Sequence, residues 1–171
     1  MWGNLNINKF TDIKFKSFKN FNSVESASYI KKIQPDIIFV YGTRILSKSI
    51  FSLSSDITIN LHMGITQAYR GSRSEFWSIL NKDFENIGST IHQIDSGIDT
   101  GKILWQTRLK YNNENHIMLR IKNLEKTIND LPIFFKSYFE GNINNSISEN
   151  NTKGKFYSTP LAADYIKLIL K

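Results

Sequence analysis

Residues 57–106 read ITINLHMGITQAYRGSRSEFWSILNKDFENIGSTIHQIDSGIDTGKILWQ, and this stretch decides the expected fold. It begins with an alternating apolar run, Ile57–Leu61, which overlaps a polar pair, Asn60 and His62. A second alternating run, Thr90–Ile94, leads into an acidic, glycine-rich turn. Alternation with a period of two is typical of β-strands. We therefore expect two strands, joined by a helix, whose carboxyl ends deliver polar groups to one edge of an open α/β sheet, where ligands bind.

Asn60, His62 and Asp99 are the chemically suggestive residues of this stretch. Asn60 and His62 are two residues apart, so on a strand their side chains point to the same side. The amide donates hydrogen bonds, and the imidazole is a donor, an acceptor or a cation near neutral pH. With Asp99 brought alongside, the trio suits acyl transfer, in which donors stabilise an oxyanion and a carboxylate moves protons. Spacing alone fits equally well a plainer interpretation, in which these residues only finish a strand and a turn.

Four motifs, in this order, resemble the formyltransferase family that uses 10-formyltetrahydrofolate. That family includes phosphoribosylglycinamide formyltransferase, methionyl-tRNA formyltransferase and the sugar-nucleotide amine N-formyltransferases. The motifs are Asn60-Leu61-His62, Tyr69-Arg70-Gly71, Gly88-x-Thr90 and Asp95-x-Gly97-Ile98-Asp99-Thr100-Gly101. The chain departs from the common family pattern at His62-Met63-Gly64, where many members have His-Pro-Ser, and at Thr66-Gln67, where many have Leu-Pro. These departures bear on the identity of the acceptor more than on the chemistry.

The resemblance implies roles for individual residues. The implied set is catalytic Asn60, His62 and Asp99, cofactor-binding Arg44, Ile45, Leu46, Asp95 and Ile98, and acceptor-binding Tyr69, Arg70 and Gly71. Two alternatives stay open: Ile45 and Leu46 are also typical of a core, and Arg70 suits either an anionic acceptor or a surface acid. We interpret His92, on the second strand, as a strand histidine with satisfied hydrogen bonds and not as a catalyst.

The remaining sequence supplies further elements of an α/β fold. A nearly continuous apolar run at 36–42 predicts a strand covered on both faces, and alternation predicts another at 13–18. Ser23 is the expected cap of a helix that runs to about Ile33 and buries a stripe beginning at Val24. The short link between the strand at 88–95 and the next one predicts an antiparallel hairpin. We expect a Rossmann-like open, mostly parallel sheet with this hairpin and with helices on both faces.

Apolar periodicity predicts three more helices. The first covers 74–81, and the second begins at Asn115 and is kinked or ended by Pro132. The third covers 161–170, and residues 142–152, rich in Asn and Ser, predict a flexible loop.

Composition narrows the class of protein. The 171 residues predict a single domain, 1–171, and there is no cysteine to form a disulfide or a thiolate site. We expect no metal cofactor, because no His/Glu spacing of the metal-binding kind occurs. The net charge is +7, but the lysines are scattered, which favours an anionic small molecule over nucleic acid. No run has the length of a membrane span and no signal peptide is recognisable, so we expect a cytoplasmic protein.

The resemblance covers about residues 20–160 and does not reach the family's first βα unit. We therefore expect an N-terminally shortened domain that self-associates or is completed by another chain. The implied reaction transfers a formyl group from 10-formyltetrahydrofolate to a primary amine, on an amino sugar nucleotide or on phosphoribosylglycinamide. The alternatives are a folate-dependent deformylase and a catalytically inactive folate-binding remnant.

Overall fold

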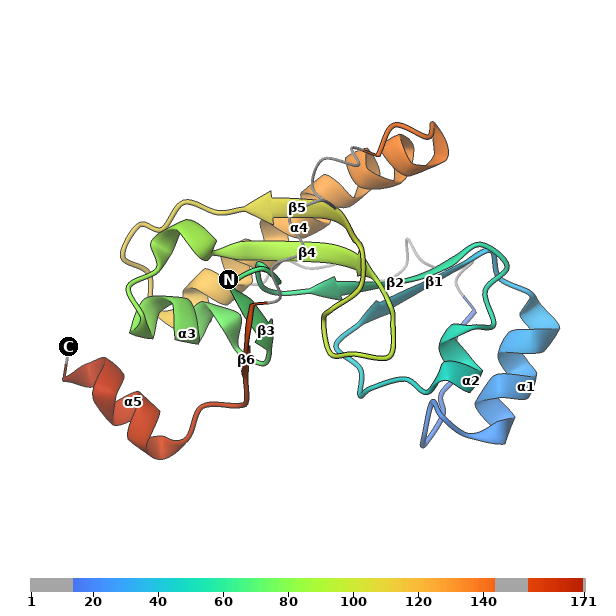
Figure 1. The fold of residues 1–171 in the computed structure, drawn as a ribbon, viewed down its shortest axis with the longest axis horizontal. Helices are drawn as coiled ribbons and strands as arrows, with labels where there is room; N and C mark the ends of the chain where they lie inside the picture. The colour runs from blue at the N-terminus through green and yellow to red at the C-terminus, as the bar shows by residue number, and fades with distance from the viewer. Residues whose placement is uncertain (1–13, 144–153, 171) are drawn as a thin grey trace.

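A computed structural model describes residues 14–143 and 154–170 (Figure 1). In chain order the elements are α1 Val24–Ile33, β1 Ile37–Tyr41, α2 Lys48–Phe51, β2 Ile57–His62, β3 Tyr69–Gly71, α3 Ser74–Leu80, the 3₁₀ turn η2 Phe84–Asn86, β4 Gly88–Gln93, β5 Ile103–Arg108, α4 His116–Phe139, β6 Lys155–Tyr157 and α5 Ala162–Ile169. The loop predicted at 142–152 lies almost entirely outside the described residues.

The main sheet has four strands in the order β1-β2-β4-β5. β1 and β2 are parallel, whereas β4 is antiparallel to both β2 and β5. Three of the four strands therefore run in one direction, and the predicted antiparallel hairpin is confirmed as β4 and β5. In Figure 1, α4 lies behind β4 and β5, and α1 and α2 lie together beyond β1.

The direction of β4 corrects one expectation about the site. The carboxyl ends of β2 and β4 do not share an edge of the sheet, because the strands pair antiparallel, with Asn60 opposite His92 and His62 opposite Thr90. The connection through β3 and α3 leaves β2 at its carboxyl end and re-enters the sheet at that same end, so β4 must run in reverse. The turn after β4 therefore has to fold back to bring Asp99 to His62.

A second, two-stranded sheet pairs segments far apart in the sequence. β3 runs parallel to β6, with Tyr69 opposite Lys155 and Gly71 opposite Tyr157. Residues 69–71, which have no strand pattern of their own, form a strand because residues 155–157 provide the partner. Local sequence carries no mark of a pairing across more than eighty residues.

The core lies between the main sheet and α4. It contains Ile59, Leu61, Met63, Ile91, Leu104 and Phe134. α4 continues through Pro132 as one 24-residue helix, so the proline does not end it. The full burial of Leu119 before the proline and of Phe134 after it offsets the hydrogen bond that proline removes.

The N-terminal part of the molecule is less covered than its sequence predicts. β1 is an edge strand among the described residues, and only Val40 of its side chains is buried. Phe39 is 37% exposed, so the predicted coverage on both faces is wrong. The predicted helix α1 is confirmed with Ser23 as its N-cap, but Val24 at the start of the predicted stripe is 83% exposed. Residues 14–18 form no strand, since nothing in the described chain pairs with them.

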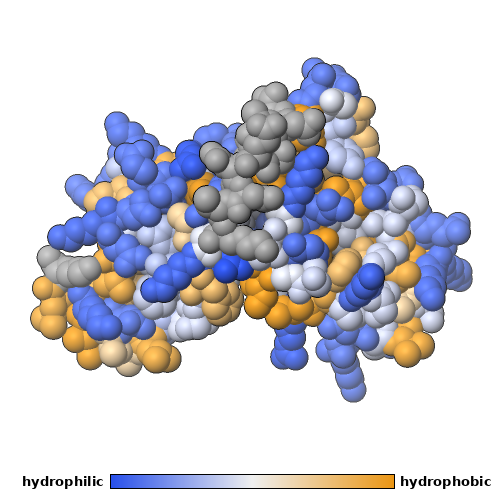
Figure 2. Space-filling model, in the orientation of Figure 1, coloured by the Kyte–Doolittle hydropathy of each residue, from blue (hydrophilic) through white to orange (hydrophobic). Residues whose placement is uncertain are grey.

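The C-terminal helix α5 presents an apolar surface. The predicted helix is confirmed, but none of its residues is buried. Apolar atoms gather over α5 at the lower left of Figure 2, where Leu161, Ile166 and Ile169 are exposed. No helix in the described ranges combines the length and apolar character needed to cross a membrane.

Candidate active site

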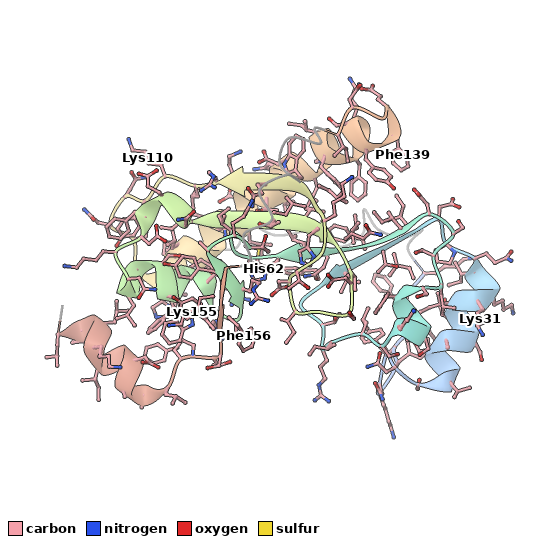
Figure 3. The ribbon with its side chains drawn as sticks, viewed as in Figure 1. Lys31, His62, Lys110, Phe139, Lys155 and Phe156 are labelled. Atoms are coloured by element: carbon pink, nitrogen blue, oxygen red, sulfur yellow. The ribbon has the colours of Figure 1, made fainter. Side chains whose placement is uncertain are left out.

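A cavity of about 490 Å³ opens beside the end of β2. It is lined by segments from β1 and its following loop, β2, the β3–α3 connection, the turn after β4, and the residues that follow β6. Of the residues implied by the sequence, those that line it are Arg44, Ile45, Leu46, Asn60, His62, Gly71, Asp95, Ile98 and Asp99. Figure 3 shows His62 near the centre of the molecule, with Phe156 of β6 close by.

The carboxylate of Asp99 is the centre of the polar cluster in this cavity. Its Oδ2 accepts a hydrogen bond from the backbone N–H of Gly71 at 2.8 Å and lies 3.4 Å from His62 Nδ1. Its Oδ1 accepts from Asn60 Nδ2 at 3.4 Å and lies 3.4 Å from His92 Nε2. The three residues predicted to act together therefore converge. Asp99 itself has a φ of +50°, a left-handed backbone conformation that is uncommon for a residue other than glycine.

The pKa of Asp99 reflects these contacts. Burial of the carboxyl group raises its pKa, but the hydrogen bond with His92, the charge of His62 and the N–H of Gly71 lower it further, so the net shift is downward. Asp99 is therefore an ionised acceptor at neutral pH.

His62 has an acceptor at each ring nitrogen. Its Nε2 donates to the carbonyl oxygen of Tyr69 at 2.9 Å, and its Nδ1 faces Asp99. This geometry suits the doubly protonated ring, yet burial lowers the pKa of His62 more than Asp99 and the Tyr69 carbonyl raise it. The ring is consequently neutral at pH 7, with Asp99 placed to stabilise the cation when a proton arrives.

His92 belongs to the same cluster, although the sequence pattern did not select it. Its Nδ1 lies 2.9 Å from the carbonyl oxygen of Gln93, and its Nε2 lies 3.2 Å from Asn60 Nδ2. Nε2 faces both the Asn60 amide and Asp99 Oδ1, and the tautomer of the ring decides which of the two it bonds. The antiparallel register of β2 and β4, which the tertiary structure decides, puts His92 opposite Asn60.

The predicted acceptor-binding residues divide into two groups. Gly71 lines the cavity, whereas Tyr69 and Arg70 do not. The Tyr69 hydroxyl donates to Asp83 at 3.0 Å, and burial raises its pKa to about 12. Arg70 bonds two backbone carbonyl groups and not a surface acid. Its Nε donates to the Gly154 carbonyl at 2.6 Å, and its Nη1 donates to the Ile98 carbonyl at 3.2 Å. Arg70 thus ties the Asp99 turn to β6.

The predicted cofactor segments form another part of the cavity wall. Ile45 is 69% exposed, which rules out a core role for this side chain. The loop that carries it is held by Asn22, whose side chain donates to the Ile45 carbonyl at 2.9 Å and accepts from Ser47 N–H at 2.8 Å. Asp95 accepts from Gly97 N–H and from the Thr100 hydroxyl, so it shapes the turn from within.

The sequence matches the family described as formyl transferase over residues 6–129, well over half of the chain. The chain belongs to the formyl transferase family. It is 33% identical over 136 residues to a methionyl-tRNA formyltransferase of Finegoldia magna, which covers 74% of this chain and 43% of that protein. It is also 33% identical over 111 residues to the bifunctional polymyxin resistance protein ArnA of Wigglesworthia glossinidia brevipalpis, covering 59% of this chain and 17% of that protein. This formyl transferase chain therefore spans less than half the length of these two relatives.

Solved structures confirm the predicted formyltransferase-like α/β fold. A sugar N-formyltransferase from Shewanella superposes with a TM-score of 0.67 at 18% identity, covering 87% of this chain and 64% of that one. A 4-N formyltransferase from Francisella tularensis has a TM-score of 0.65 at 22% identity, covering 94% and 61%. An N-formyltransferase from Helicobacter canadensis, in complex with folinic acid and dTDP-3-aminofucose, has a TM-score of 0.56 at 26% identity, covering 70% and 44%.

Proposed function

We propose that this formyl transferase chain moves a formyl group from 10-formyltetrahydrofolate to a primary amine on a small, anionic acceptor. The observation that carries the proposal is the convergence of Asn60, His62 and Asp99 on one cavity. A donor, an imidazole and an ionised carboxylate are the groups that acyl transfer requires. The Helicobacter canadensis relative, with folinic acid and an amino sugar nucleotide bound, supports the same donor and the same class of acceptor.

The proposed reaction begins when the acceptor amine attacks the formyl carbon. The carbonyl π electrons move to oxygen, where Asn60 Nδ2 and the ring of His62, which takes up a proton from solvent beside Asp99, stabilise the oxyanion. Asp99 stabilises the imidazolium and relays the proton lost by the amine to N10 of the folate. The oxyanion electrons then re-form the carbonyl as the bond between the formyl carbon and the protonated N10 breaks, and tetrahydrofolate and the formylated amine leave.

The contacts of the Asn60 amide are long. Asn60 Nδ2 lies 3.4 Å from Asp99 and 3.2 Å from His92, longer than strong hydrogen bonds. Catalytic hydrogen bonds are often long before substrate binds and shorten in the reacting complex. These two contacts orient the half-buried amide of Asn60, and their length leaves its N–H groups able to donate to a substrate oxygen.

We assign the folate to the wall formed by Arg44, Ile45, Leu46, Asp95 and Ile98, and the acceptor to the wall that begins at Gly71. The exposed Ile45 side chain supplies apolar surface for a flat ring, and the adjacent backbone groups supply polarity. Tyr69 and Arg70 act on the acceptor indirectly, the first by holding His62 through its carbonyl and the second by holding the Asp99 turn.

The test is the release of tetrahydrofolate from 10-formyltetrahydrofolate, measured alone and with amino sugar nucleotides and phosphoribosylglycinamide. We expect release that depends on an amine and falls about 10²–10³-fold in Asp99→Asn. The matched control is Asp36→Asn, because Asp36 is exposed and its side chain accepts a hydrogen bond from Ser55, away from the cavity. Formate without an added amine would instead identify a deformylase. Binding of folinic acid by folded protein without turnover on any amine would identify a folate-binding protein.

A further inference from the structure

A second group of charged side chains lies at the α3–α4 end of the cavity, outside the proposed catalytic cluster. It consists of Arg73, Glu75 and Arg120, all of which line the cavity. Glu75 is only 3% exposed, an unusual position for a carboxyl group. None of the motifs that identify the formyl transferase family includes these three residues.

The buried Glu75 is held by one neutral partner. Asn123 Nδ2 donates to Glu75 Oε1 at 3.2 Å and to the Gly88 carbonyl at 2.7 Å. The pKa of Glu75 is raised, because the effect of burial exceeds the lowering effects of the Asn123 hydrogen bond and of the charges of Arg120 and Arg73. Both arginines thus act on Glu75 through space, although neither forms an ion pair with it among the described residues.

The two guanidinium groups lie on facing elements. Arg73 lies close enough to the first turn of α4 to act on His116. Burial is the main cause of the lowered pKa of His116, and the charge of Arg73 lowers it further. Arg120 follows His116 by four residues on α4, so the two side chains share one face of the helix. Neither guanidinium group has a hydrogen-bond partner in the described parts of the chain. Two cations with free donors facing one buried carboxylate leave a net positive wall.

This wall is adjacent to the reacting atoms and on the acceptor side. Ser74, between Arg73 and Glu75 in the sequence, has its hydroxyl 3.4 Å from His62 Nε2. The folate wall follows β1, whereas α3 and the start of α4 lie on the other side of β2 (Figure 1). A molecule whose amine reaches Asn60 and His62 can therefore extend toward the arginines without crossing the folate wall.

We propose that Arg73 and Arg120 form an oxyanion site for the phosphate or pyrophosphate of the acceptor, an inference that rests on the proposed function. Guanidinium groups bind phosphate through paired, charge-assisted hydrogen bonds, which a lysine or a neutral side chain does not reproduce. Glu75 reduces the positive charge of the site and so limits how tightly an anion binds. The same chemistry could hold the glutamate carboxylates of the folate, and the experiment separates the two sources.

The experiment is calorimetric titration of the folded protein with inorganic pyrophosphate, and separately with folinic acid. Arg73→Gln and Arg120→Gln are each expected to weaken pyrophosphate binding about tenfold or more and to leave folinic acid binding unchanged. Arg108→Gln is the matched control, because Arg108 lies outside the cavity and bonds Glu85 and Asn86. Glu75→Gln keeps an acceptor for Asn123 and, at a pH where Glu75 is ionised, removes a negative charge, so pyrophosphate should then bind more tightly.

The other results either overturn the assignment or separate it from the proposed function. Equal weakening in Arg108→Gln would show a general charge effect, and unchanged binding in both cavity variants would remove the site. Loss of folinic acid affinity in Arg73→Gln or Arg120→Gln would assign the arginines to the cofactor. Pyrophosphate binding through both arginines, without any formyl transfer, would keep the anion site and refute the proposed function. Formyl transfer without pyrophosphate binding through the arginines would refute the anion site and support the proposed function.

Discussion

The backbone N–H of Gly71 donates a 2.8 Å hydrogen bond to Oδ2 of Asp99, the oxygen that also faces His62. Gly71 is the last residue of β3, which pairs with β6. The pairing of two short strands from distant parts of the chain therefore positions the carboxylate of the polar cluster. The β3–β6 pairing therefore acts on Asp99 through the backbone N–H of Gly71.

Gly71→Ala should destabilise the protein and displace Asp99. Gly71 has a φ of +93°, and an added Cβ would collide with the Tyr157 carbonyl oxygen and the Phe156 ring. We expect a loss of at least about 2 kcal/mol in the free energy of unfolding, measured by urea denaturation. Gly141→Ala is the control, because Gly141 has a φ of +69° with open space around it, and it should cost about 1 kcal/mol. Equal losses would show that backbone angle alone matters at Gly71.

Asp99→Asn should lower the pKa of His62 further while the protein stays folded. The Asp99 charge raises the pKa of His62 against the larger effect of burial, so removing it leaves burial less opposed. The measurement is an NMR titration of the His62 ring in wild type and in Asp99→Asn. A His62 pKa that rises or stays constant would show that the two side chains are not electrostatically coupled.

The free energy of unfolding should fall as the solution is acidified below about pH 6.5, the ordinary pKa of histidine. The folded pKa values of His62 and Asp99 are both lowered, so both groups bind protons more readily when unfolded. Their contribution is complete above the unfolded pKa and is lost as pH falls through the folded pKa. Urea denaturation between pH 7.5 and pH 4 should show a shallower decline in His62→Gln. An unchanged slope would mean that His62 titrates alike in both states.

Phe39→Lys should reduce self-association of the protein. Phe39 is 37% exposed on β1, which is an edge strand in the described part of the sheet, and open edges beside apolar side chains promote pairing between chains. Sedimentation velocity should show a concentration-dependent species that Phe39→Lys diminishes. Ile169→Lys, which makes the same change on the 82% exposed side chain in α5, should not diminish it. A monodisperse wild-type monomer at micromolar concentration would contradict the prediction.

Much of the local structure followed from the sequence. Period-two alternation located β2 and the β4–β5 hairpin, and Ser23 marked the start of α1. Where burial depends on distant segments, local patterns misled: Val24 was expected in a buried stripe and is 83% exposed. Apolar periodicity shows which face of a helix is able to be buried, but only a partner surface decides whether it is.

The sequence alone indicated the family of this chain and singled out Asn60, His62 and Asp99 as candidate catalytic residues, because motif order and residue type are local properties. Only the tertiary structure decided which groups meet them. The antiparallel register of β2 and β4 brought His92 to Asn60, and the pairing of β3 with β6 gave Asp99 its Gly71 donor. Register and long-range pairing depend on how the whole chain packs, so no local pattern encodes them.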